Sequence, residues 1–206
     1  MAPRTKGDQT RQRVVEQAAP VFNRRGYWGA SLRDVMEATG LEKGGIYNHF
    51  SSKDELALAA FEHNVGVMGD QIRAALQGRR HAVDRLRAIV DVYRHFAVDP
   101  PFAGGCPIMN AAVDSDDTHP ALRDRVRAAM DDLRDNTVAR IVTRGVERGE
   151  LRPDTDPDAV ATVFVATLEG ALMLGQLYGG STYMDVAAGH LDTLITGLAS
   201  DQEDRQ

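Results

Sequence analysis

The chain has 206 residues, of which 26% are charged and 43% hydrophobic, as is typical of one or two soluble globular domains. No apolar run reaches the ~18 residues that cross a bilayer, the N-terminus has no apolar signal-peptide core, and one cysteine excludes an internal disulfide framework. We therefore expect a cytoplasmic protein with no membrane partner.

The net charge of −6 argues at first against a nucleic-acid partner, but the charge is unevenly distributed. Residues 1–33 carry seven Lys/Arg and two Asp/Glu, whereas residues 61–206 carry 15 Lys/Arg and 23 Asp/Glu. A basic N-terminal part can meet phosphate while an acidic body stays in solvent. The same basic residues could also be no more than a solvated helix surface.

The N-terminal part begins with a segment, residues 1–8, that we expect to be flexible. Arg4 and Lys6 in this arm could reach phosphates or a minor groove, or could belong to a disordered tail. A first helix is expected from about residue 8 to residue 25. Pro20 lies inside it and should kink or break it, because proline removes a helix hydrogen bond.

Residues 31–56, SLRDVMEATGLEKGGIYNHFSSKDEL, predict two short helices, a tight turn between them, and the start of a third helix. Ser31 followed by Asp34 is a capping-box pattern at the first helix start. Ser52 followed by Glu55 repeats that pattern where the third helix begins. The layout is that of a helix-turn-helix, whose second helix enters the major groove of DNA.

The second short helix contains two glycines that intrinsic propensity does not favour. Gly40 supplies the turn before it, whereas Gly44 and Gly45 lie within it. They make sense if the helix backbone must approach a large anion such as duplex DNA. The spacing predicts inward-facing Leu41, Ile46 and Phe50 and outward-facing Lys43, Tyr47, Asn48 and His49.

Three segments together, VVEQAAPVFNRRGYWGAS, ATGLEKGGIY and YNHFSSKDEL, resemble the DNA-binding domain of TetR-type (TetR/AcrR) transcriptional regulators. The resemblance implies an all-α fold of about nine helices. It places a three-helix helix-turn-helix DNA-binding domain at residues 1–53 and a helical ligand-binding and dimerisation domain at residues 54–206. It further implies a repressor that binds a palindromic operator as a homodimer and is released by a small-molecule effector.

Phosphate contacts should supply most of the affinity, and base contacts the sequence preference. We expect Tyr47, His49 and Lys53 to bind phosphates and Lys43 to read guanine. Arg33 and Asn48 are either base readers or solvated side chains. The candidate DNA-binding residues are Arg4, Lys6, Trp28, Ser31, Arg33, Lys43, Gly44, Gly45, Tyr47, Asn48, His49 and Lys53.

Beyond residue 56, helical periodicity continues to the end of the chain. Helices are expected at about 53–77, 81–98, 120–148, 157–178 and 182–199. A further short helix is expected after Pro107 and should end at about residue 113. The helix at 157–178 is apolar on nearly every side and should be buried. The helix at 182–199 is also mostly apolar. Two mostly apolar helices at the C-terminus provide more apolar surface than a small helical domain needs for its own core, so we expect helices 157–178 and 182–199 to form a homodimer interface.

The effector pocket is expected among the helices of residues 81–178. Most of its candidate residues are apolar or aromatic, and Asn110 and Glu169 are polar exceptions that either orient a ligand or pair inside the fold. The candidate ligand-binding residues are Tyr93, Phe96, Cys106, Ile108, Met109, Asn110, Phe164, Leu168, Glu169 and Met173.

Several alternatives stay open at this point. Cys106 could make the chain a thiol-based redox sensor. The chain could also be a helical interaction protein without DNA binding, or an activator in place of a repressor. An enzyme is not expected, since the sequence has no HExxH, Walker or GxSxG motif, and neither a metal site nor a cofactor is expected.

Overall fold

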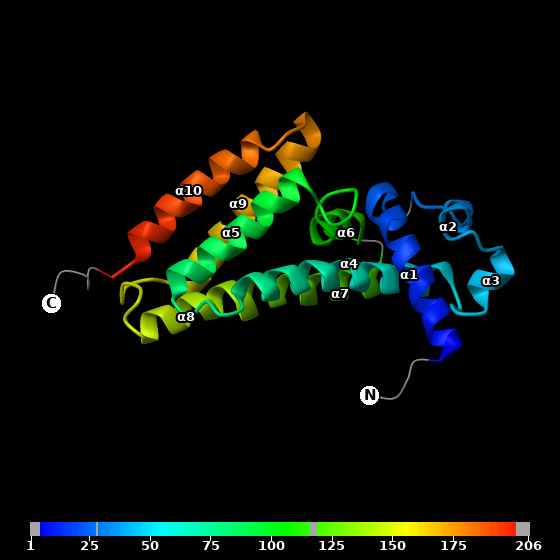
Figure 1. The fold of residues 1–206 in the computed structure, drawn as a ribbon, viewed down its shortest axis with the longest axis horizontal. Coiled ribbons are helices and arrows are strands. Elements are labelled where there is room, and N and C mark those ends of the chain that lie inside the picture. The colour runs from blue at the N-terminus through cyan, green and yellow to red at the C-terminus, as the bar shows by residue number, and fades with distance from the viewer. Residues whose placement is uncertain (1–4, 28, 116–118, 201–206) are drawn as a thin grey trace. The chain divides into compact units, whose positions relative to one another are not determined.

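The computed structural model describes residues 5–27, 29–115 and 119–200 (Figure 1). Within these ranges the backbone is helical and contains no strand, and Leu151 and Ala199 form one isolated antiparallel bridge. The described residues form nine helices when α7, η1 and α8, which follow one another without a break, count as one. The all-α prediction is confirmed. Arg4 and Trp28 lie outside the described residues.

The helix bounds follow the sequence pattern closely, and the helix expected at 157–178 has those limits in the structure. Residues 132–139 of the long central helix adopt π-helical geometry. The elements are α1 (Lys6–Arg25), α2 (Leu32–Thr39), α3 (Lys43–Tyr47), α4 (Lys53–Leu76), α5 (Ala82–Val98), α6 (Pro107–Ser115), α7 (Pro120–Asp131), η1 (Asp132–Ala139), α8 (Arg140–Glu147), α9 (Pro157–Tyr178) and α10 (Thr182–Leu198).

The chain divides into two compact units. The first unit comprises Met1–Met68 and Phe102–Val126, and the second comprises Gly69–Pro101 and Arg127–Gln206. Both α4 and α7 therefore contribute residues to each unit. The functional division expected at residue 53 stays a prediction, and the compact units are divided at other points.

In the first unit, α1 packs through a buried face that includes Val14, Ala18 and Phe22. The helix runs through Pro20 without a break, so the expected break is wrong, whereas the alternative of a kink stays a prediction. Glu16, whose carbonyl loses its partner to Pro20, is exposed, and water can satisfy that oxygen. The helix also starts earlier than expected, at Lys6, because the preceding Thr5 caps it.

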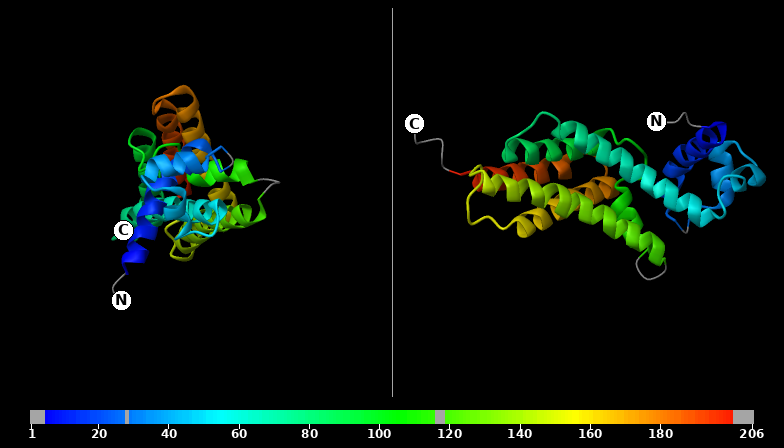
Figure 2. Two further views of the ribbon diagram at one scale, coloured as in Figure 1. Left: turned by 90° about the vertical axis from the view of Figure 1, so that its right-hand side faces the viewer. Right: turned by 90° about the horizontal axis from the view of Figure 1, so that it is seen from below.

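In the second unit, α5, η1, α8, α9 and α10 form a helical bundle (Figures 1 and 2). One face of α9 is buried there, and it includes Phe164, Leu168 and Leu172. The opposite face is open in the single chain, since Leu177 is 69% and Met173 47% exposed. The expectation that α9 is buried on every side is therefore not met within one chain.

By length and composition alone, α9 is the one described helix that could cross a membrane. The helix is not one uninterrupted apolar run, because Asp158 and Glu169 lie within it. Core helices of water-soluble proteins share this length and composition, and 44% of the apolar stretch is buried within the chain.

Candidate DNA-binding and regulatory site

The start of α2 carries the predicted capping box. The Ser31 hydroxyl accepts a hydrogen bond from the Asp34 N–H at 3.2 Å, and the Asp34 carboxylate accepts from the Ser31 N–H at 2.8 Å. The Asp34 carboxylate also accepts from the Ser31 hydroxyl at 2.7 Å, and these two bonds from Ser31, followed by the contact with Arg25 at 2.5 Å, lower the pKa of Asp34. The helix ends at Gly40, whose φ of 64° is left-handed and closes the turn. Local sequence therefore fixes the entry and exit of α2.

The next helix, α3, presents the side chains that the sequence places outward. Ile46 is 1% exposed and anchors the helix, whereas Lys43, Tyr47 and Asn48 are exposed and His49 is half-buried. The Lys43 Nζ lies 5.8 Å from the centroid of the Tyr47 ring, one helical turn away. A cation and a phenol thus share the solvent side of α3, as binding to phosphate and base edges requires.

The glycines of α3 are not required by the fold itself. Gly44 has no positive φ, and a Cβ added to it would meet nothing within 4 Å. A Cβ on Gly45 would reach the Leu41 side chain at 3.5 Å, which is ordinary contact. The glycines leave the backbone of α3 bare, and at Gly44 the bare backbone faces open space.

The start of α4 departs from the predicted capping box. Ser52 Oγ accepts from the Glu55 N–H at 3.0 Å, as expected. The Glu55 carboxylate, however, accepts from the backbone N–H and hydroxyl of Ser51, at 2.7 and 2.8 Å, in place of Ser52. Arg11 contacts the same carboxylate at 3.2 Å, and the pKa of Glu55 is lowered, chiefly by the Ser51 N–H.

The basic residues near the N-terminus fall into two groups. Arg11 and Arg25 are engaged in ion pairs that tie α1 to α4 and α2, so they have structural roles that the sequence did not reveal. Lys53 donates to the Ala30 carbonyl at 2.7 Å, which uses one of its three donors. Lys6 and Arg33, two predicted DNA-binding residues, are exposed, as is Ser31.

Two family models match this chain. Residues 14–60 match bacterial regulatory proteins of the tetR family, and residues 82–191, more than half of the chain, match a tetracyclin repressor-like C-terminal domain. The chain belongs to the TetR family of transcriptional regulators. Its helix-turn-helix, formed by α2 and α3, is accordingly the DNA-binding element of a TetR-family regulator.

Solved structures and characterised proteins agree with this assignment to the TetR family. The chain is 48% identical to a TetR transcriptional regulator from Chloroflexus aurantiacus J-10-FL, with a TM-score of 0.90 over 94% of this chain and 98% of that one. A TetR-family regulator from Cytophaga hutchinsonii is 36% identical, with a TM-score of 0.87 over 96% and 98%. The repressor DhaR of Mycobacterium sp. strain GP1 is 27% identical over 166 residues, which cover 79% of this chain and 80% of DhaR.

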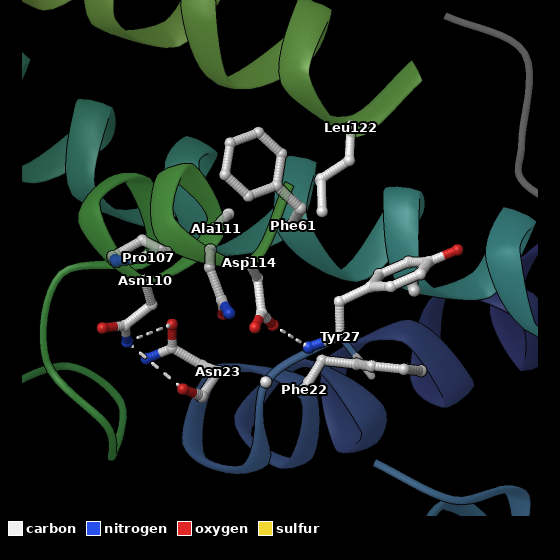
Figure 3. Close-up of a pocket in the computed structure, with 12 residues that line it drawn as sticks. Phe22, Asn23, Tyr27, Phe61, Pro107, Asn110, Ala111, Asp114 and Leu122 are labelled. Carbon is white, nitrogen blue, oxygen red and sulfur yellow. Dashed lines mark hydrogen bonds between the residues drawn. The ribbon is translucent and has the colours of Figure 1, made fainter. Parts of the chain in front are cut away.

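This TetR-family chain joins the end of α1 to α6 through a polar cluster that we name the α1–α6 junction, made of Asn23, Tyr27, Asn110 and Asp114 (Figure 3). The Asn23 amide donates to two carbonyl oxygens of the loop 103–105, at 2.9 and 3.0 Å. The Asn110 amide donates to the Asn23 carbonyl at 3.2 Å. The Asp114 carboxylate accepts from the Tyr27 N–H.

At the junction, the backbone at Gly26 lies so close to the Asp114 side chain that there is no room for a larger residue. Gly26 has a φ of 75°, and a Cβ added to it would lie 2.6 Å from a carboxylate oxygen of Asp114. Burial raises the pKa of the Tyr27 phenol well above its usual range, helped by Asp54. Its hydroxyl lies 2.9 Å from His119 Nε2. No prediction from the sequence included the junction, although Asn23 follows Val15 and Ala19 at intervals of four and so lies on the buried face of α1.

The predicted ligand-binding residues fall into both compact units. In the second unit Tyr93, Phe164 and Leu168 are buried, and so is Phe96, whose ring centroid lies 5.7 Å from that of Tyr93. The Tyr93 hydroxyl donates to Glu169 Oε1 at 3.0 Å, so this polar exception pairs inside the fold. Met173, by contrast, lies on the open face of α9.

The remaining four ligand candidates lie on or just before α6 in the first unit. Cys106 and Ile108 are buried, Met109 is half-buried, and Asn110 belongs to the junction. A cavity of about 40 Å³ beside the junction is lined by Phe22, Phe61 and Leu122 among others, and by Asn110 from the predicted set. A drug-sized ligand needs roughly 300 Å³ or more, so side chains would have to move for an effector to enter here.

Within the described ranges, no group of three or more His, Cys, Asp or Glu side chains is placed to hold a metal ion. The groups that α3 exposes are of another kind. Lysine, tyrosine and backbone N–H groups, such as Lys43, Tyr47 and the backbone of α3, contact phosphate oxygens without a metal. The arrangement of α2 and α3 therefore offers recognition of DNA by direct contact.

Proposed function

We propose that this TetR-family regulator is a cytoplasmic, ligand-responsive repressor that binds a palindromic operator as a homodimer. The observation that carries the proposal is the exposed side of α3, where Lys43 and Tyr47 stand beside a backbone left bare at Gly44. The named repressor DhaR is a relative over most of its length, which supports repression.

Dimerisation is supported by the open face of α9, which we name the outer stripe. Its residues are small or apolar, follow one another at intervals of three or four, and are exposed or half-buried in the single chain. A Cβ added to Gly170 would meet nothing within 4 Å, so a partner helix can approach closely there. The outer stripe consists of Ala159, Val163, Ala166, Gly170, Met173 and Leu177.

A contiguous apolar face of this kind usually marks an interface. A second copy of the chain related by a two-fold axis would cover it with the same stripe, with α10 adding its exposed Val186. Such a dimer carries two helix-turn-helix elements, and two-fold symmetry in the protein calls for two-fold symmetry in the operator.

Ligand response is supported by the α1–α6 junction. Three polar side chains there, Asn23, Asn110 and Asp114, tie α6 to the end of α1 and to the following turn. An effector that favours one position of α6 over another would therefore favour one position of α1. An effector that binds one of these two conformations more tightly than the other is sufficient to shift the protein away from the conformation that binds DNA.

The thiol-sensor alternative is less well supported, because Cys106 is only 2% exposed. An oxidant would have to reach a thiol that the fold covers. A thiol reagent added to the protein–operator complex separates the two hypotheses. A thiol sensor at Cys106 should release the operator, whereas a regulator that responds to a small-molecule effector should not.

The test measures binding of the purified protein to the DNA upstream of its own gene by fluorescence anisotropy, between about 50 and 200 mM salt, where phosphate contacts weaken. Lys43→Ala should weaken binding at every salt concentration. Arg127→Ala, an exposed arginine of α7, should leave it unchanged. Absence of binding at any salt, or equal loss in both variants, would contradict the proposal.

A further inference from the structure

The second unit contains a cleft of about 110 Å³ that we name the arginine cleft. It is bounded by residues from the end of α4, the start of α5 and the continuous helix formed by η1 and α8. Its lining includes five arginines and a single carboxylate. The arginines are Arg80, Arg85, Arg140, Arg144 and Arg148, and the carboxylate is Glu150.

Three of these arginines stand in one row. Arg140 and Arg144 on α8 and Arg148, the residue that caps its C-terminal end, follow one another at intervals of four, the spacing at which helix side chains are neighbours. Like charges at this spacing repel one another and destabilise a helix. The cleft is also lined by Asn136 and Thr137 of η1, next to this row of arginines. Both are uncharged, so they do not offset the repulsion between the arginines.

The acidic neighbour does not neutralise the cleft. Glu150 Oε2 accepts from the Ala82 N–H at 2.7 Å at the start of α5, and Glu150 Oε1 lies 3.8 Å from Arg148. In the part of the chain that the structure describes, Arg85, Arg140 and Arg144 form no ion pair. The buried Nε of Arg85 moreover has no hydrogen-bond partner there.

We propose that the arginine cleft binds a small anion bearing phosphate groups. Guanidinium groups present planar forks of donors that match phosphate oxygens, and they remain charged at any physiological pH. The volume of about 110 Å³ accommodates a phosphate or diphosphate group but not a large organic body, so the rest of such a ligand would lie in solvent. This binding goes beyond the proposed function, because it involves neither α3 nor the α1–α6 junction.

The experiment titrates the full-length protein with inorganic pyrophosphate by isothermal calorimetry, in chloride buffer at constant ionic strength. We expect saturable binding of one pyrophosphate per chain. Because Arg140 and Arg144 are exposed, the double variant Arg140→Gln/Arg144→Gln should keep its fold, as circular dichroism would verify. It should lose at least tenfold in affinity. Arg127→Gln removes the same kind of charge from α7 outside the cleft and should bind as the wild type does.

Three outcomes would overturn the proposal. One is the absence of saturable heat with the wild-type protein at matched ionic strength. A second is equal weakening in Arg127→Gln, which would show that net charge alone attracts the anion. The third comes from titration with a short DNA duplex lacking the operator. If the double variant weakens duplex binding but not pyrophosphate binding, the cleft contacts DNA instead.

Discussion

Substituting Gly44 by alanine should stabilise the protein and weaken its binding to DNA. Gly44 lies inside α3 without a positive φ, and the added Cβ meets nothing within 4 Å. Alanine should therefore raise the free energy of unfolding by up to about 1 kcal/mol, because glycine is the poorer helix former. For a chain of this size that corresponds to a rise in Tm of roughly 2–4 °C.

The same methyl group would project from the side of α3 that we propose faces DNA. Forcing an extra methyl into a packed contact costs about 1–3 kcal/mol, which is roughly a 5- to 150-fold loss in affinity. Thermal unfolding and anisotropy with operator DNA measure the two effects separately. Gly66→Ala in α4, where an added Cβ also meets nothing within 4 Å, is the matched control and should affect stability alone. If Gly44→Ala binds DNA as tightly as wild type, the bare backbone is not what brings α3 to the bases.

Three further predictions concern the dimer, the junction and acid stability. Met173→Glu should convert the dimer to a monomer in light scattering, whereas Val113→Glu, at a more exposed apolar position on α6 (80% against 47%), should not; a dimeric Met173→Glu would refute the interface. Asn23→Ala should lower the free energy of unfolding by about 1–3 kcal/mol, because two part-buried hydrogen bonds to the carbonyls of Ala103 and Gly105 are lost, each contributing roughly 0.5–1.5 kcal/mol. A loss below about 0.5 kcal/mol in denaturant melts would argue against the junction. Asp34→Ala should destabilise the protein at pH 7, and the difference should shrink as the pH falls below the ordinary pKa of 3.8. The sign follows because the folded-state pKa is lowered, so the unfolded chain binds more protons there; a difference that stays constant down to pH 2 would contradict it.

Local rules account for what could be predicted from the sequence. The capping box of Ser31 and Asp34, the turn at Gly40 and the limits of α9 each depend on residues within a few positions of one another. The outward placement of Lys43 and Tyr47 follows from helical periodicity in the same way. These features need no knowledge of the rest of the fold.

The features that the sequence analysis missed depend on residues far apart in the chain. Asn23 meets Asn110 across 87 positions, and no local pattern joins them. Arg85 lines the same cleft as Arg144 only because the start of α5 is packed against α8. The Glu55 carboxylate binds Ser51 in place of Ser52, a choice between adjacent residues that side-chain geometry decides.

The division of α4 between the two units bears on how the DNA-binding part could be isolated. Chain termination after residue 53 would remove Ala57 and Phe61, which line the cavity with Phe22, and Asn64, whose amide donates to the α1 backbone at 3.2 Å. Leu122, from much later in the chain, completes that lining. No contiguous N-terminal fragment contains all of these groups unless it extends beyond α6. Limited proteolysis should accordingly release no stable fragment that ends at residue 53, and studies of DNA recognition call for the whole chain.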